Sequence, residues 1–111
     1  MAGLTIKRGD TLPAVEASLL ENGVPVCLTG AFVHFVYIYI VDGKRYERTA
    51  TVVSEAGGTV RYDWVEGDTD VPGKYRAHWR VTFPTLDAAG NNQVEHWPRV
   101  GYIDLVIEDD V

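Results

Sequence analysis

The sequence predicts an all-β fold, an antiparallel immunoglobulin-like β-sandwich of seven or eight strands. Turn signals rich in glycine, asparagine and aspartate recur roughly every ten residues, a spacing typical of such sandwiches. The segments between the turns alternate apolar and polar side chains, and none shows convincing helical spacing of its apolar residues. Since parallel strands need long crossover connections, we expect antiparallel pairing. We expect the 111 residues to form a single domain, residues 1–111.

The first half of the chain contains five expected strands. Residues 4–7 form a short strand, and residues 13–22 alternate until Asn22-Gly23, a two-residue hairpin signal. Residues 24–28 form the third strand, in which Pro25 suits an edge or a bulge. Residues 32–41 are a long β-branched and aromatic run that stops at a second hairpin signal, Asp42-Gly43. Residues 45–53 follow and are mostly polar on one side.

The second half begins with residues 59–64, in which Val60, Tyr62 and Trp64 share one face. Residues 74–83 give the clearest alternation, and residues 102–108 form the last strand. Residues 84–92 are expected to be a loop, and residues 93–97 either pair back as a strand or extend that loop. In the strand 74–83, Tyr75, Ala77, Trp79, Val81 and Phe83 lie on a buried face, and Lys74, Arg76, His78, Arg80 and Thr82 on a wet face.

A tyrosine corner is expected at the start of the strand 74–83. Asp70, Gly73 and Tyr75 have the composition of this motif, in which a buried tyrosine donates its hydroxyl to the upstream turn. Trp64, Trp79 and Phe35 are the expected core anchors, because each aromatic side chain buries about 150–250 Å².

Composition and charge exclude several classes of function. The net charge is −6 and the pI about 4.9, so the chain lacks the basic footprint of a nucleic-acid binder. The apolar run 32–41 is shorter than the ~20 residues of a membrane helix, and no apolar segment follows Met1 as a signal peptide would require. Cys27 is the single cysteine, so no intrachain disulfide forms, and we expect it to be a small packed residue.

No constellation of residues predicts catalysis, a metal site or a cofactor. The two serines lie outside any nucleophile elbow, and the histidines His34, His78 and His96 lack metal-ligand spacing. Residues 66–70 include three carboxylates that resemble part of a calcium loop, but the twelfth-position glutamate of an EF-hand is missing. We expect a polar turn whose aspartates bond the local backbone, and we expect no enzyme.

The strand 32–41 points instead to a protein interface. Its two faces are both apolar, with Phe32, Val36, Ile38 and Ile40 on one of them. One core covers only one such face, so another loop or a neighbouring subunit has to cover the second. The basic stripe Lys74, Arg76, His78 and Arg80 is either a solvated face or a contact for acidic groups, such as the Glu108-Asp109-Asp110 tail of another copy. The candidate interface residues are Phe32, Val36, Ile38, Ile40, Arg76, His78 and Arg80.

Several segments, taken in their order along the chain, resemble one family. They are Ile6-Lys7-Arg8-Gly9-Asp10-Thr11-Leu12-Pro13, residues 19–31 with Leu28-Thr29-Gly30-Ala31, the strand Val33-His34-Phe35, residues 60–64 with Gly67-Asp68-Thr69, and Pro72-Gly73-Lys74-Tyr75-Arg76-Ala77. In this order they resemble the N-terminal domain of phage baseplate upper proteins and related tail proteins, over nearly the whole chain. Two features depart from the family: Cys27 replaces its usual Asp, and the given sequence ends soon after the last expected strand, where the family usually carries a long C-terminal extension, so we expect the docking module alone.

The resemblance implies a non-enzymatic bacteriophage virion structural protein, a tail or baseplate docking subunit located in the virion. Its partners would be other virion proteins and copies of itself, without a cofactor, nucleic acid or membrane. A capsid decoration or neck protein is the alternative within this class. A small carbohydrate-binding module for host cell-wall glycans is the alternative in another class, based on stacking by Tyr37, Tyr39, Tyr46, Trp97 and Tyr102.

Overall fold

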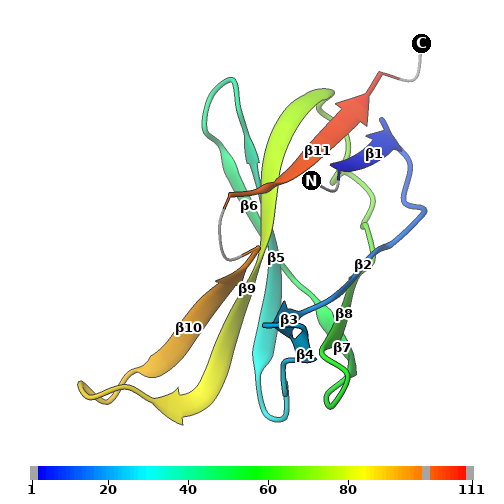
Figure 1. Ribbon diagram of the computed structural model, residues 1–111. Helices are drawn as coiled ribbons and strands as arrows, with labels where there is room; N and C mark the ends of the chain where they lie inside the picture. Colours follow the sequence, from blue (N-terminus) through cyan, green and yellow to red (C-terminus); the bar gives the residue numbers. More distant parts are fainter. Residues whose placement is uncertain (1–2, 99–100, 110–111) are drawn as a thin grey trace.

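The computed structural model describes residues 3–98 and 101–109, which contain eleven strands and no helix (Figure 1). The expected all-β, sandwich-like fold is therefore confirmed. The strands are β1 (Gly3–Lys7), β2 (Val15–Ser18), β3 (Leu20–Glu21), β4 (Val24–Pro25), β5 (Phe32–Tyr39), β6 (Arg45–Thr49), β7 (Thr51–Ser54), β8 (Thr59–Tyr62), β9 (Gly73–Leu86), β10 (Asn92–Trp97) and β11 (Ile103–Glu108).

The strands form one large sheet and two small ones. The six-stranded sheet has the order β1-β11-β9-β5-β6, and β10 also pairs with β9. The three-stranded sheet has the order β2-β8-β7, and β3 and β4 form a separate hairpin. Every pair is antiparallel except β1 and β11, which run parallel, so the expectation of uniformly antiparallel pairing is wrong at this edge.

The strand count exceeds seven or eight because two expected strands are interrupted. Residues 45–53 divide at Ala50, where the chain leaves the six-stranded sheet as β6 and enters the three-stranded sheet as β7. The Ala50 amide still donates to the Val33 carbonyl at 2.8 Å, so this corner remains attached to β5. Residues 13–22 likewise divide into β2 and β3 at the buried Leu19, whose amide bonds to Gly58 rather than to a neighbouring strand.

Strand β9 is longer than expected and forms a hairpin with β10. It continues through Pro84 to Leu86, so the expected loop at residues 84–92 shrinks to the turn between Leu86 and Asn92. Residues 93–97 do pair back on β9, the first of the two alternatives. In Figure 1 this hairpin extends beyond the body of the sandwich at the lower left. The molecule is elongated, with principal extents of 49 × 27 × 26 Å.

The core lies between the six-stranded and three-stranded sheets and is aromatic. Phe35 is fully buried and stacks on Tyr62 of β8 at 5.5 Å between ring centroids. It also contacts Trp79 at 4.9 Å and Trp64 at 5.8 Å, so the three expected core anchors are confirmed. The tyrosine corner is confirmed too, since the buried Tyr75 donates its hydroxyl to the Val71 carbonyl at 2.7 Å.

Two smaller expectations have different outcomes. Cys27 is exposed, so the prediction of a packed cysteine is wrong. The segment before Cys27 pairs with another strand only at β4. The next residue, Leu28, enters the core instead of Cys27 and is 1% exposed. Two residues named in the expectations lie outside the described residues: Met1, named for the signal peptide, and Asp110, named for the acidic tail.

Candidate protein interface

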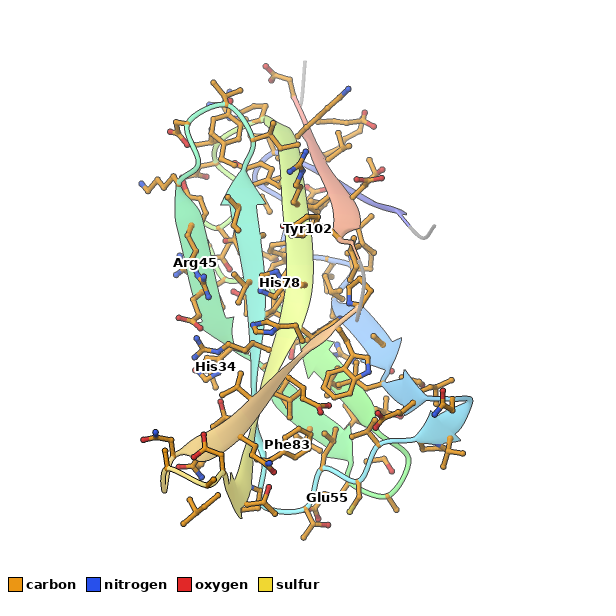
Figure 2. All side chains as sticks on the ribbon, turned by 60° about the vertical axis from the view of Figure 1, so that its left-hand side comes forward. His34, Arg45, Glu55, His78, Phe83 and Tyr102 are labelled. Carbon is orange, nitrogen blue, oxygen red and sulfur yellow. The ribbon has the colours of Figure 1, made fainter. Side chains whose placement is uncertain are left out.

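The register of β5 and β9 brings the two groups of candidate interface residues onto one surface. Ile38 lies opposite Arg76, and Val36 lies opposite His78. Directly opposed residues project to the same side of a sheet. We call this side the outer face. The core residues of β5 alternate with the residues on this side and point the other way, toward the three-stranded sheet. Figure 2 shows it, with His34, Arg45 and His78 across β5, β6 and β9.

The second apolar side of β5 was expected to be covered either by another part of the chain or by a neighbouring subunit, and the chain itself covers Val36. Its side chain is 0% exposed within the chain itself. Arg80 of β9 and Glu47 of β6 form an ion pair at 2.8 Å, and β5 lies between these two strands. The pair therefore crosses the outer face above β5, next to Val36. A partner cannot contact Val36 without displacing such neighbours.

Other apolar residues of the outer face remain open. Phe32, at one end of β5, is 70% exposed, and Ile40, just beyond the other end, is 48% exposed. Ile38 is half-buried. Tyr102 is 42% exposed and lines a pocket of about 350 Å³ together with Ile38 and Ile40. The outer face thus has a polar centre with exposed apolar groups at both ends.

The basic stripe on β9 is less exposed than the alternation predicted. Lys74 and Arg76 are exposed, but His78 is 9% exposed and Arg80 is half-buried. The reason is that the outer face is crowded by neighbouring strands: Arg80 pairs with Glu47, and His78 lies under the His96 ring of β10 at 5.1 Å between centroids. The Arg76 guanidinium lies 5.4 Å from the centre of the Tyr102 ring, a cation–π contact.

A pocket of about 300 Å³ opens at the polar centre of the outer face. We call it the histidine pocket; its lining residues are Arg45, His78, His96, Pro98, Gly101 and Tyr102. Burial is the main cause that lowers the pKa of His78, to about 4, and nearby His96, Arg45 and Arg80 add to the effect. The ring is therefore neutral near pH 7. Its Nε2 atom is buried and has no hydrogen-bond partner among the described residues.

Sequence reasoning missed a second polar cluster, which is centred on Asp68. This carboxylate is 9% exposed and lies between the layers. It accepts a hydrogen bond from the Tyr62 hydroxyl, one from the Val65 amide at 2.8 Å and one from Arg48 Nε at 3.1 Å. The expected polar turn at residues 66–70 is present, but Asp68 also joins β6 and β8. The segment Gly67-Asp68-Thr69 was the signal available in the sequence.

The Asp68 cluster shifts the titration of its neighbours. Burial, reinforced by the hydrogen bond to Asp68, raises the pKa of Tyr62. Burial also raises the pKa of Tyr37, whose hydroxyl donates to the Asp68 carbonyl at 3.4 Å. The hydrogen bond to Asp68 raises the pKa of Arg48. Both tyrosines stay protonated at physiological pH, so they can act only as hydrogen-bond donors and acceptors that fix the turn.

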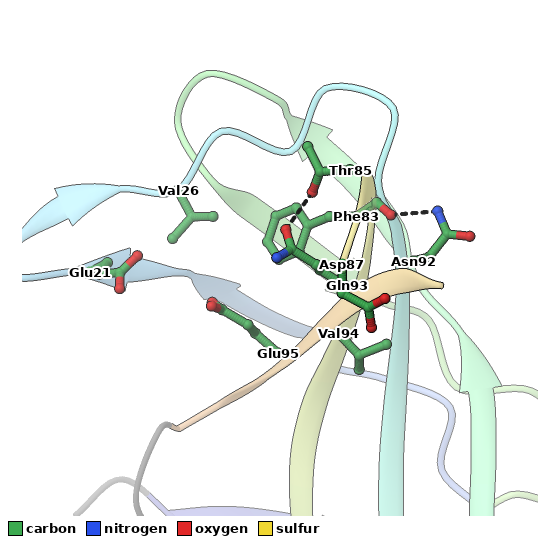
Figure 3. Close-up of a pocket in the computed structure, with 9 residues that line it drawn as sticks. All are labelled: Glu21, Val26, Phe83, Thr85, Asp87, Asn92, Gln93, Val94 and Glu95. Atoms are coloured by element: carbon green, nitrogen blue, oxygen red, sulfur yellow. Dashed lines mark hydrogen bonds between the residues drawn. The ribbon is translucent and has the colours of Figure 1, made fainter. Parts of the chain in front are cut away.

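A larger hollow lies between the hairpin and the β3–β4 pair, with a volume of about 610 Å³ (Figure 3). Its hydrogen bonds lie within the protein and are structural. The Thr85 hydroxyl donates to the Gln93 side-chain oxygen at 2.8 Å, and the side-chain amide of Asn92 donates to the Phe83 carbonyl at 2.8 Å. The lining is mainly polar or acidic, with Glu21, Val26, Phe83, Thr85, Asp87, Asn92, Gln93, Val94 and Glu95. It contains no nucleophile beside a base, and the described residues hold no group of three metal ligands.

The expected sugar platform is not assembled as the alternative requires. Tyr37 and Trp97 are buried, and Tyr39 and Tyr46 are half-buried, which leaves Tyr102 as the one exposed ring of the five. The carbohydrate-binding alternative rested on stacking by these five rings, and four of them are buried or half-buried. Among the described residues, no helix is long and apolar enough to cross a membrane.

Comparison with known proteins identifies a similar fold. The chain resembles the solved structure of the N-terminal domain of phage TP901-1 ORF48, with a TM-score of 0.64 and 15% sequence identity. The match covers 96% of this chain and 85% of the other chain. No protein-family model and no curated protein matches the chain. The likeness at this identity shows a shared sandwich fold over nearly the whole chain.

Proposed function

We propose that the chain is a non-enzymatic structural subunit of a bacteriophage virion, a tail or baseplate docking subunit that acts by protein–protein assembly. The observation that carries the proposal is the fold likeness to a phage domain over 96% of the chain. The segments that resemble phage baseplate upper proteins, in the same order along the chain, agree with this proposal. The partners would be other virion proteins and copies of this chain.

The outer face is the surface that fits this role. Exposed Phe32 and Ile40 are the apolar anchors, and the exposed Arg76 and the half-buried Arg80 are the basic contacts. Apolar anchors beside arginines are typical of protein interfaces. A stable contact would bury about 1,200–2,000 Å² in total and would repeat by symmetry in a particle. Assembly of this kind needs no catalytic group.

Copurification with phage particles tests the proposal. An antibody against the purified chain is used on tailed particles banded in a density gradient from an induced lysate of the source strain. We expect the chain in the particle band, and immunogold labelling at the tail. Presence only among the unassembled proteins would contradict the proposal, and labelling of the head would favour a capsid or neck protein instead.

A further inference from the structure

The histidine pocket is built from three regions of the sequence, around residues 45, 78 and 96–102. Arg45 comes from β6, His78 from β9, His96 from β10 and Tyr102 from the turn that precedes β11. His78 is the deepest of these side chains at 9% exposure, whereas Arg45 and His96 are exposed at the rim. Figure 2 shows Arg45, His78 and Tyr102 on the same side of the sheet. The pocket is thus open to a group that reaches it from outside the chain.

Two buried nitrogen atoms, one in the pocket lining and one beside it, have no hydrogen-bond partner among the described residues. His78 Nε2 is buried without a partner among the described residues, and so is the nearby Arg80 Nε. Buried polar atoms in proteins nearly always have partners, so such atoms call for an external one. Glu47, a carboxylate that acts on His78, is already engaged: its Oε1 lies 2.8 Å from Arg80 and 3.7 Å from Arg45.

The charge around the pocket selects an anion. The register partners of His34, Val36 and Ile38 include three arginines, Arg45, Arg76 and Arg80. The carboxylates on the same face are Glu47 on β6 and Asp104 on β11, which lies opposite Arg76, so the arginines outnumber them. The whole chain nevertheless has a net charge of −6, so its remaining surface is strongly acidic. One molecule therefore carries both a basic patch and the acidic surface that complements it.

We propose that the histidine pocket binds an aspartate or glutamate side chain of a second copy of this chain. Arg45 would hold the carboxylate by a charge-assisted bond, and His78 would donate from Nε2 at the pocket floor. Two basic faces repel one another, so the contact is head-to-tail, with the outer face of one copy against the acidic surface of the next. This inference deepens and rests on the proposed function, since it names the partner of the same face.

Sedimentation velocity on the purified chain over a concentration series tests the inference. The wild type is expected to associate, and Arg45→Glu to raise the dissociation constant by about 100-fold or more, because it places a carboxylate opposite the incoming one. Arg45→Lys keeps the charge and is expected to cost about tenfold or less. Arg61→Glu is the matched control: Arg61 is comparably exposed, at 42% against 48% for Arg45, but lies on β8 in the other sheet.

A wild type that stays monomeric at every concentration overturns the inference, and so does equal weakening by Arg45→Glu and Arg61→Glu, which would show only a net-charge effect. Circular dichroism confirms that each variant is folded. The outcome is separable from the proposed function. A monomer found in the particle band would leave the virion role intact, and an associating chain absent from particles would leave only the self-contact.

Discussion

The two polar clusters of the molecule differ in whether their hydrogen bonds are complete. Around Asp68, every near neighbour has a partner: Tyr62, Val65 and Arg48 all donate to the one buried carboxylate. Around His78, buried nitrogen atoms are left without partners among the described residues. A complete cluster holds the fold together, and an incomplete one costs free energy until something outside the chain completes it. The first cluster is therefore structural and the second is the candidate contact.

The largest expected effect comes from breaking the complete cluster. Asp68→Ala leaves the Tyr62 hydroxyl and the Val65 amide without their acceptor, so the free energy of unfolding should fall by about 3–5 kcal/mol. Urea denaturation followed by tryptophan fluorescence measures it. Asp70→Ala, at an exposed position two residues away, is the matched control and should change stability by less than about 0.5 kcal/mol. Equal losses in the two variants would refute the structural role of Asp68.

The incomplete cluster should make stability depend on pH. Because the pKa of His78 is about 4 in the folded chain and about 6.5 when unfolded, the unfolded state binds more protons between these values. Stability should therefore fall as pH drops from 6.5 toward 4, by up to about 1.4 kcal/mol per pH unit from this group. Glu47 faces the same site and reduces the effect.

His78→Phe isolates that contribution, since it removes the titrating ring while other groups continue to titrate. The stability difference between variant and wild type should shift in favour of the variant as the pH falls through this window. Urea unfolding at several pH values between 4 and 7 measures the difference. If the free energies of unfolding of variant and wild type change with pH by the same amount, burial does not hold His78 neutral.

The tyrosine corner should give a smaller loss. Tyr75→Phe removes one hydrogen bond to the Val71 carbonyl and should cost about 1 kcal/mol. Tyr39→Phe is the comparison, because its bond to the Pro72 carbonyl is 3.4 Å long and therefore weak. Thermal unfolding of both variants would rank them, and a greater loss for Tyr39→Phe would contradict the assignment of the corner to Tyr75.

The smallest change is expected for His78→Phe at neutral pH. Since Nε2 has no partner to lose, an apolar ring of similar size should alter the free energy of unfolding by less than about 1 kcal/mol. The change in the free energy of unfolding is to be compared with that of Asp68→Ala, which should be several times larger. A loss of several kcal/mol would mean that His78 is part of the structural framework, as Asp68 is.

Local patterns in the sequence predicted the core better than the surface. The alternation in the strand 74–83 identified Tyr75 and Trp79 as buried, and an aspartate–glycine–tyrosine spacing was enough to place the tyrosine corner. Both signals lie within a few residues. The pocket at His78 depends on the register of β9 with β5 and β10, which brings Arg45 and His96 from distant segments. Alternation specifies which face a residue joins, but it does not specify its neighbours on that face.

The same limit explains what stayed open and what was wrong. Whether the chain itself or a neighbouring subunit covers Val36 stayed open, because the sequence does not show that the pair between Arg80 and Glu47 crosses β5. The Asp68 cluster was missed because Tyr62 and Arg48 approach it only after β6 and β8 have packed in different sheets. Residues 84–86 were expected to belong to a loop, but β9 continues through Pro84 to Leu86, which pairs with Asn92 of β10.

In the assembled particle, we expect protein to cover the outer face of the six-stranded sheet. Hydroxyl-radical footprinting on free chain and on purified particles tests it most directly. Phe32 and Tyr102, exposed in the free chain, should become protected in particles, while exposed Leu12 and Val65, outside that face, should keep more of their labelling. Undiminished labelling of Phe32 and Tyr102 in particles that contain the chain would contradict it.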